Sequence, residues 1–296
     1  MNRMILRLAT RNSPLALWQA RWVSGLLRRA HPGLRVELVP MTSSGDRDRS
    51  AALYQSTSVG VFVREIQQAV LEGRADAGVH SCKDLPTQSP DGLVFAATPG
   101  RADPRDALIT ADGRGLDDLP LGAVVGTSSL RRQVQLAARR PDLQFVPIRG
   151  NVDTRIAKLK RGEVQATLLA MAGLHRLGLV VASRAVPLDP WNVCVPAPAQ
   201  GIVALDCRDG DRLTQHRLAA ISDPEAWRAA TLERAILRAC EGGCSLPLGV
   251  HARRREGRWE LAGALGSDIG AHPLRTVHLG GDPTTLAERA VTALKC

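Results

Sequence analysis

The chain has 296 residues, 44% of them hydrophobic, and a formal net charge of +10 with a pI near 10.1. This length predicts two or three domains with large buried cores, and no apolar run approaches the roughly 18 residues of a membrane-spanning helix. The positive charge raises nucleic acid as a partner, but only 3% of the residues are aromatic and no zinc-finger, helix-turn-helix or RNP-like pattern is present, which disfavours it.

Strand-like and helix-like patterns alternate along the first two thirds of the chain. The alternation of polar and apolar residues from Met1 to Arg7 predicts a first strand at 5–9 rather than a signal peptide. Ser13 followed by Pro14 matches the start of a helix. Further strands are expected at residues 35–39, 75–79, 93–97, 107–110, 123–125, 144–148 and 167–171. This alternation predicts parallel sheets flanked by helices, with ligand sites at the carboxyl ends of strands.

Three segments interrupt this pattern. Residues 42–60 are polar, rich in Ser and Gly and without clear periodicity, so they are interpreted as a mobile loop and a candidate lid. The segments 99–104 and 196–201 contain Pro and Gly in short succession. We expect both to be hinges or crossovers between domains.

The last third of the chain has a different pattern. Asp223 and Pro224 begin a long helix that is expected to end near Cys240. Two strands are then expected near 250–254 and 259–265. One helix followed by strands is typical of a small α+β domain.

The six cysteines are scattered without the paired spacing of metal ligands. That distribution favours reduced thiols over a disulfide framework, and it predicts no metal site. Because the start of the chain is interpreted as a strand and not as a signal peptide, a cytoplasmic location is expected.

Positive charge is concentrated between Gly126 and Arg176, where eight arginines and two lysines stand against three acidic residues. Ser128 and Ser129 follow a strand in this stretch and precede a helix that begins with Arg131 and Arg132. Free backbone N–H groups at the start of a helix bind anions. The stretch therefore predicts an anion site, although a serine before a helix is most often only an N-cap.

Short motifs distributed over the chain resemble those of the porphobilinogen deaminase (hydroxymethylbilane synthase) family. They are Thr10–Ala20, His80–Pro86, Asp103–Ala107, Gly126–Arg132, Arg149–Val152, Ala172–Gly178 and Glu241–Cys244, and they follow the family's order over nearly the whole chain. The resemblance implies an α/β fold with two periplasmic-binding-protein-like domains plus a small C-terminal α+β domain. We expect the first domain at 1–98 and 198–217, the second at 99–197, and the third, with the cofactor cysteine, at 218–296.

The resemblance also implies a function. The chain is expected to be a monomeric transferase of haem biosynthesis that joins four porphobilinogen molecules head to tail with loss of ammonia, starting from a dipyrromethane cofactor attached to a cysteine. Each added ring brings two carboxylates, which an arginine-rich cleft suits. The resemblance assigns cofactor binding to Lys83, Asp84, Ser128, Ser129, Arg131, Arg132, Gly150 and Cys244. It assigns substrate binding to Arg11, Ser13, Gln19, Arg149, Arg155 and Arg176. No nucleic-acid or membrane partner is expected.

Asp84 is the candidate catalytic group. Loss of ammonia leaves an electron-poor pyrrole, and a carboxylate near the pyrrole nitrogens stabilises positive charge and relays protons. Without the resemblance, an Asp two residues before Pro86 is more simply interpreted as a turn or cap residue.

Two cysteines compete for the cofactor. Cys240 is in register with Leu232 and Ile236 at fourfold spacing, which predicts a core position. Cys244 follows the helix stop Gly242-Gly243 and is expected on an accessible loop. The resemblance assigns the attachment to Cys244.

The chain departs from the family pattern at two places. The loop before Gly60 has no lysine, where the family usually carries lysines, and Ala199 stands where the family usually has Gly before Gln200. These departures leave open a slow or divergent paralogue. They also leave open a noncatalytic anion-binding or sensory protein on the same scaffold.

Overall fold

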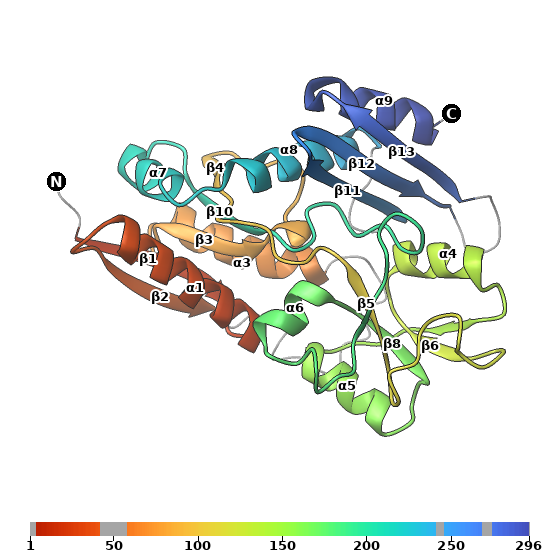
Figure 1. The fold of residues 1–296 in the computed structure, drawn as a ribbon. Coiled ribbons are helices and arrows are strands. Elements are labelled where there is room, and N and C mark those ends of the chain that lie inside the picture. The colour runs from red at the N-terminus through yellow and green to blue at the C-terminus, as the bar shows by residue number, and fades with distance from the viewer. Residues whose placement is uncertain (1–3, 42–57, 241–245, 268–273, 296) are drawn as a thin grey trace. The chain divides into compact units, whose positions relative to one another are not determined.

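A computed structural model describes residues 4–41, 58–240, 246–267 and 274–295 (Figure 1). The chain divides into two compact units. Unit 1 consists of Met1–Arg101 and Ile202–Arg228, and unit 2 consists of Ala102–Gly201 and Ala229–Cys296. In the described part of the chain, every helix is too short or too polar to cross a bilayer.

Unit 1 contains a five-stranded sheet in the order β2-β1-β3-β10-β4 (Figure 1). Its strands are β1 (Ile5–Arg11), β2 (Arg35–Met41), β3 (Ala77–Ser81), β4 (Leu93–Ala97) and β10 (Val203–Arg208). Its helices are α1 (Pro14–Ala30), α3 (Ser58–Leu71) and α7 (Arg212–Ala219), with a short 3-10 turn, η1 (Cys82–Asp84), directly after β3. β1 is parallel to β2 and β3, whereas β10 is antiparallel to both of its neighbours.

The first helix begins where the sequence predicted. Ser13 is the N-cap of α1, and its hydroxyl accepts a hydrogen bond from the backbone N–H of Ala16 at 3.4 Å. Val23 and Leu27 lie on the buried face of this helix and belong to the same core cluster as Leu8 of β1. Burial of that apolar face is what fixes α1 against the sheet.

Unit 2 contains a second five-stranded sheet, in the order β7-β6-β8-β5-β9. Its strands are β5 (Asp106–Thr110), β6 (Val124–Gly126), β7 (Gln144–Val146), β8 (Ala166–Ala170) and β9 (Val186–Pro187). Its helices are α4 (Leu130–Arg139), α5 (Val152–Lys160) and α6 (Met171–Arg176). β6 is parallel to β7 and β8, and β5 is antiparallel to β8 and β9, so the pattern of directions repeats that of unit 1.

The C-terminal part of the chain forms a three-stranded antiparallel sheet, β11-β12-β13. Its elements are α8 (Pro224–Ala239), β11 (Leu248–Arg255), β12 (Arg258–Leu265), β13 (Arg275–Gly281) and α9 (Pro283–Lys295). The buried face of α9, with Leu286, Ala290 and Leu294, covers one side of β12 and β13 (Figure 1). This arrangement is the small α+β domain that the sequence predicted.

The strands expected from the sequence are all present, with boundaries within two residues. The sequence did not predict β9, β10 or β13, and the expectation of parallel sheets was wrong for β5 and β10. Direction is set by distant pairing rather than by local residue pattern. The predicted domain boundaries at 98, 197 and 217 stay predictions.

Candidate functional site

The strand ends of unit 2 bring its predicted anion-binding residues together. β6, β7 and β8 run parallel, so their carboxyl ends lie at one edge of the sheet. Ser129 is the N-cap of α4 at this edge. Ser128 donates a hydrogen bond to the Ile148 carbonyl at 3.0 Å and accepts one from the Ile148 N–H at 3.1 Å, which ties the end of β6 to the end of β7.

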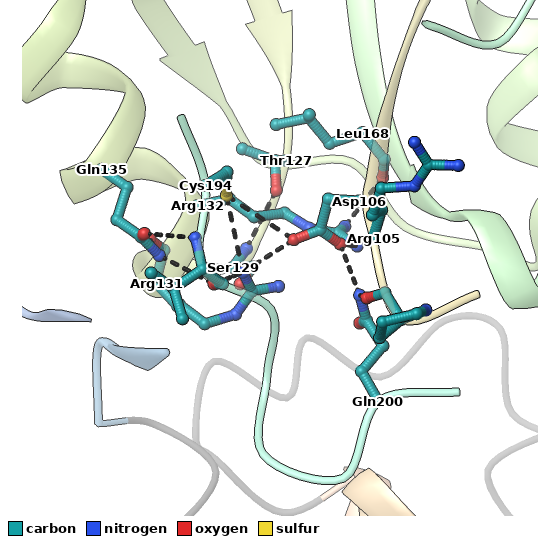
Figure 2. Close-up of polar contacts among 12 residues, drawn as sticks. Arg105, Asp106, Thr127, Ser129, Arg131, Arg132, Gln135, Leu168, Cys194 and Gln200 are labelled. Carbon is teal, nitrogen blue, oxygen red and sulfur yellow. Dashed lines mark hydrogen bonds and ion pairs between the residues drawn. The ribbon is translucent and has the colours of Figure 1, made fainter. Parts of the chain in front are cut away.

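Arg131 and Arg132 share one buried carboxylate, that of Asp106 (Figure 2). Nη1 of Arg131 lies 2.7 Å from Oδ2 of Asp106, and Nη2 of Arg132 lies 2.6 Å from Oδ1. Asp106 opens β5 and pairs with Ala170 at the end of β8, so the antiparallel strand delivers its carboxylate to the same sheet edge. Two fixed positive charges therefore meet one negative charge.

Backbone and amide groups complete this network (Figure 2). Arg131 also donates to the Val195 carbonyl at 2.7 Å, and Arg132 donates to the Leu168 carbonyl at 2.8 Å. The side-chain amide of Gln200 donates to Oδ1 of Asp106 at 2.9 Å. Multiple donors on a buried carboxylate are what make such a charge tolerable inside a protein.

Burial and charge shift the pKa values of this network. Burial alone would raise the pKa of Asp106, but the guanidinium groups of Arg131 and Arg132 outweigh it and hold that pKa well below its usual range. Cys194, whose Sγ lies 3.6 Å from Oδ2 of Asp106, has its pKa raised to about 12 by burial and by that carboxylate. At neutral pH the carboxylate is ionised and the thiol is protonated.

Arg155 lies close enough to Arg132 to feel its charge. The pKa of Arg155 is lowered by burial and by the like charge of Arg132. Its Nε donates to the carbonyl of Gly150 at 2.9 Å, where the backbone has a positive φ of 110°. Arg149 is exposed beside this glycine. A carboxylate bound between the guanidinium groups of Arg132 and Arg155 would relieve their mutual repulsion.

Arg176 is the other buried arginine of the prediction. It is the last residue of α6 and is 9% exposed. Nη2 donates to the carbonyl of Gly201 at 2.7 Å, and burial lowers the pKa of this guanidinium to about 10. It remains a cation at neutral pH.

The predicted residues of unit 1 lie at the ends of β1 and β3. Arg11 ends β1, and Ser13 is committed to the cap of α1. Gln19 is buried and donates to the hydroxyl of Ser81, the last residue of β3, at 3.0 Å. Lys83 and Asp84 follow in η1, both half-buried. Because β1 and β3 are parallel, these residues lie at one edge of the unit 1 sheet.

Sequence reasoning missed three members of the unit 2 network, namely Asp106, Cys194 and Gln200. Asp106 gave a usable signal, since it is a lone carboxylate at the start of the apolar run Ala107–Ile109. Gln200 was noted only as part of a hinge, and Cys194 carried no local pattern. Their roles depend on side chains that are distant along the chain, which no local pattern reports.

Some predictions fall on residues that the structure does not describe. Cys244 lies in 241–245, and most of the predicted 42–60 loop lies in 42–57, so both are outside the described residues. Within the described ranges, no group of three or more His, Cys, Asp or Glu side chains is arranged to hold a metal ion.

Two family models match the chain. Residues 6–216 match the model described as porphobilinogen deaminase, dipyromethane cofactor binding domain, and residues 227–292 match the model described as porphobilinogen deaminase, C-terminal domain. Together the two matches span most of the chain.

Solved structures with partial likeness include the VFT2 domain of BvgS from Bordetella pertussis, with a TM-score of 0.45, 16% identity, and coverage of 79% of this chain and 92% of that one. YhfZ from Shigella flexneri has a TM-score of 0.40 and 17% identity, with coverage of 82% and 99%. The L-cystine solute receptor of Neisseria gonorrhoeae has a TM-score of 0.45 and 16% identity, with coverage of 77% and 89%. At these scores the likenesses support no functional inference.

Proposed function

This chain belongs to the porphobilinogen deaminase family, and we propose that Asp84 is its catalytic carboxylate and Cys244 the attachment point of its dipyrromethane cofactor. The family match confirms the predicted reaction, which is the stepwise head-to-tail condensation of four porphobilinogen molecules, with loss of ammonia, to hydroxymethylbilane in tetrapyrrole biosynthesis. The chain is therefore a transferase with dipyrromethane as cofactor. This supports the enzyme over the noncatalytic alternative.

The observation that carries the proposed site is the charge imbalance at the strand ends of unit 2. Two buried guanidinium groups, those of Arg131 and Arg132, share the single carboxylate of Asp106, and Arg155 has its pKa lowered partly by Arg132. Such a cluster has a net positive charge and donors suited to carboxylates. The residues present therefore fit a group that carries acetate and propionate side chains.

We assign the cations and hydroxyl groups of this edge to the carboxylates of the cofactor and of the growing chain. Cofactor binding is proposed for Ser128, Ser129, Arg131, Arg132 and Gly150, and substrate binding for Arg149, Arg155 and Arg176. The same division assigns Lys83 and Asp84 to the cofactor, and Arg11, Ser13 and Gln19 to the substrate. Of these, Ser13 and Gln19 have hydrogen bonds within unit 1 that make them positioning groups. The cofactor, when bound, supplies the free pyrrole carbon that starts the chain.

Asp84 lies in η1, immediately after the end of β3. A half-buried carboxylate at this place can accept a proton from the reacting pyrrole and stabilise positive charge on its nitrogen. Lys83, its neighbour, is held in the same turn and presents a cation for carboxylates. The two adjacent side chains thus combine proton transfer with anion binding.

The choice of Cys244 is supported by the state of Cys240. Cys240 is half-buried at the end of α8, and burial raises the pKa of its thiol. A raised pKa disfavours the thiolate that forms a thioether. Cys82 and Cys207 are both buried, which disfavours them as attachment points. Cys244, which the sequence predicts to lie on an accessible loop, is therefore the better candidate.

We further propose a monomer in the cytoplasm with no nucleic-acid partner. Among the described residues, the cysteines Cys194, Cys207 and Cys240 are free thiols, which suits a reducing compartment. The monomer is supported by the family resemblance alone.

Asp84→Ala tests the catalytic assignment. We expect the variant to fold and to release ammonia from porphobilinogen at least about 100-fold more slowly, because a positioned acid-base group contributes on that scale. Asp91→Ala, an exposed carboxylate in the same unit, is the matched control and should keep its activity. Turnover of Asp84→Ala near that of the unchanged protein would remove Asp84 from the mechanism.

Cys244→Ser tests the attachment. Intact-protein mass spectrometry should find the mass of two condensed pyrroles on the unchanged protein and on Cys240→Ser, but not on Cys244→Ser. Retention of the added mass in Cys244→Ser would place the thioether elsewhere.

A further inference from the structure

One segment, Cys194–Gln200, contacts the arginine pair and the C-terminal sheet at the same time. On the arginine side, the Val195 carbonyl accepts from Arg131, and Gln200 donates to Asp106. Gln200 also donates to the Pro104 carbonyl at 2.8 Å, just before β5. The position of this segment therefore sets where one acceptor of Arg131, the Val195 carbonyl, lies. It also sets where Gln200, a donor to Asp106, lies (Figure 2).

The other side of the segment is fixed by a buried carboxylate on α8. Glu233 is fully buried and accepts hydrogen bonds from the backbone N–H of Ala199 at 2.5 Å and from that of Ala252, in β11, at 2.7 Å. The N–H of Val250 also donates to the Pro196 carbonyl at 2.9 Å. One carboxylate thus joins the segment to the C-terminal sheet.

Close packing leaves the segment little freedom at this contact. A Cβ added to Gly249 would come within 2.6 Å of the Val195 carbonyl oxygen, so the strand and the segment touch through their backbones. Ala199 itself has a φ of 60°, a left-handed conformation that costs free energy for any residue other than glycine. The bond to Glu233 holds this strained residue directly before Gln200.

We propose that Glu233 is a positioning residue for the reaction, acting through Ala199, Gln200 and Asp106 on Arg131 and Arg132. A carboxylate presents two acceptor oxygens, so it satisfies both backbone N–H groups at once. A glutamine of the same size would turn an NH2 group toward one of them and lose that bond. The inference rests on the proposed role of the arginine pair in holding carboxylates, and it adds the C-terminal domain to the groups that determine their geometry.

We call this path from Glu233 through Ala199, Gln200 and Asp106 to the arginine pair the relay. Glu233→Gln tests it, and Glu225→Gln is the matched control because Glu225 is exposed on the same helix. We expect kcat/KM per folded, cofactor-loaded molecule to fall about tenfold in Glu233→Gln, within the cost of a small displacement of a positioning group. In ¹H–¹⁵N spectra, the Nε–H resonance of Arg132 and the side-chain amide of Gln200 should shift. Glu225→Gln should leave both resonances and kcat/KM unchanged.

A double-variant cycle separates positioning from loss of stability. Gln200→Met keeps the length of the side chain but removes its hydrogen bonds, and adding Glu233→Gln to it should lower kcat/KM little further, because both act through one path. Independent, multiplicative losses would overturn the proposal, as would unmoved Arg132 and Gln200 resonances in folded Glu233→Gln. Should that variant fail to fold, Glu233→Asp, which keeps the charge but shortens the reach, takes its place with the same expected shifts.

The two proposals fail differently. Shifted resonances with unchanged kcat/KM would support the relay and count against the assigned role of the arginine pair. Unshifted resonances with lowered kcat/KM would overturn the relay and leave that role intact.

Discussion

The two five-stranded sheets share a strand order and a pattern of directions but differ in how they hold a buried carboxylate. In each, the fourth strand in spatial order is antiparallel to its neighbours. In unit 1 this strand carries Asp206, which bonds to the imidazole of His80 and the amide of Gln67, both at 3.0 Å. In unit 2 it carries Asp106, which bonds to two guanidinium groups and one amide.

The difference in partners decides what each carboxylate does. Asp206 lies opposite Gly78 inside the sheet, and its partners form a small polar core. Asp106 lies at the strand-end edge, and its two cationic partners leave an excess of positive charge there. The same strand position therefore holds an internal polar cluster in unit 1 and, in unit 2, the charge imbalance on which the proposed anion site rests.

The largest expected effect comes from neutralising each carboxylate in turn. Asp106→Asn leaves two buried guanidinium groups without a counter-charge and should destabilise unit 2 by about 3–5 kcal/mol. Asp206→Asn keeps an acceptor and a donor group for the imidazole of His80 and the amide of Gln67, and it should cost about 1 kcal/mol in unit 1. Native-state hydrogen exchange of amides in β5 and β3 measures each unit separately. Equal losses of stability in the two variants would show that the charge imbalance around Asp106 does not contribute to the stability of unit 2.

The pH dependence of the same variants gives a second measure. The pKa of Asp106 is held below its usual range in the folded protein, so its contribution to stability is present above about pH 4 and is lost as the pH falls below that value. Asp106→Asn should therefore lose less stability than the unchanged protein between neutral pH and strong acid. An identical acid dependence in the two proteins would contradict the lowered pKa.

A smaller effect is expected from filling two glycine positions. In Gly78→Ala the new Cβ would meet Asp206 Oδ1 at 2.3 Å and His80 Nε2 at 2.6 Å, so the polar cluster of unit 1 must shift at a cost of about 2–3 kcal/mol. In Gly126→Ala, at the end of β6, the closest atoms are methyl groups of Ile148 and Val164 at 3.1 Å, which can yield for about 1 kcal/mol or less. Urea denaturation curves compare the free energies of unfolding of the two variants. A larger loss of stability in Gly126→Ala than in Gly78→Ala would show that the polar cluster around Gly78 is not the more tightly packed of the two sites.

Much of the fold that underlies this comparison could be predicted from the sequence. The Ser13-Pro14 cap, the alternating strand pattern and the Asp223-Pro224 helix start were recovered as α1, the two main sheets and α8. These features are local, because caps and periodicity depend on neighbouring residues. Pairing is not local, which is why β10 and its direction were missed.

The site was accessible in part for the same reason. Ser128, Ser129, Arg131 and Arg132 follow one another in the chain, and their place at a strand end was predicted. The carboxylate that holds the arginines inward comes from a strand far away in sequence, so the sequence predicted a cluster of cations without its counter-ion. Whether Arg131 and Arg132 point inward or outward depends on Asp106, which only the folded structure shows.

The smallest expected effect concerns the Cys194–Gln200 segment, which supports Asp106 and not Asp206. Ala199 has a φ of 60°, where a Cβ costs about 1–2 kcal/mol, while glycine loses about 0.5–1 kcal/mol more chain entropy on folding. Ala199→Gly should therefore raise the free energy of unfolding of unit 2 by about 0.5 kcal/mol. Ala219→Gly, at the end of α7 with ordinary helical backbone, should lower that of unit 1 by up to about 1 kcal/mol. If Ala199→Gly destabilises unit 2 as Ala219→Gly does unit 1, the segment is relaxed at Ala199, and the bond from its N–H to Glu233 holds no strained conformation in place.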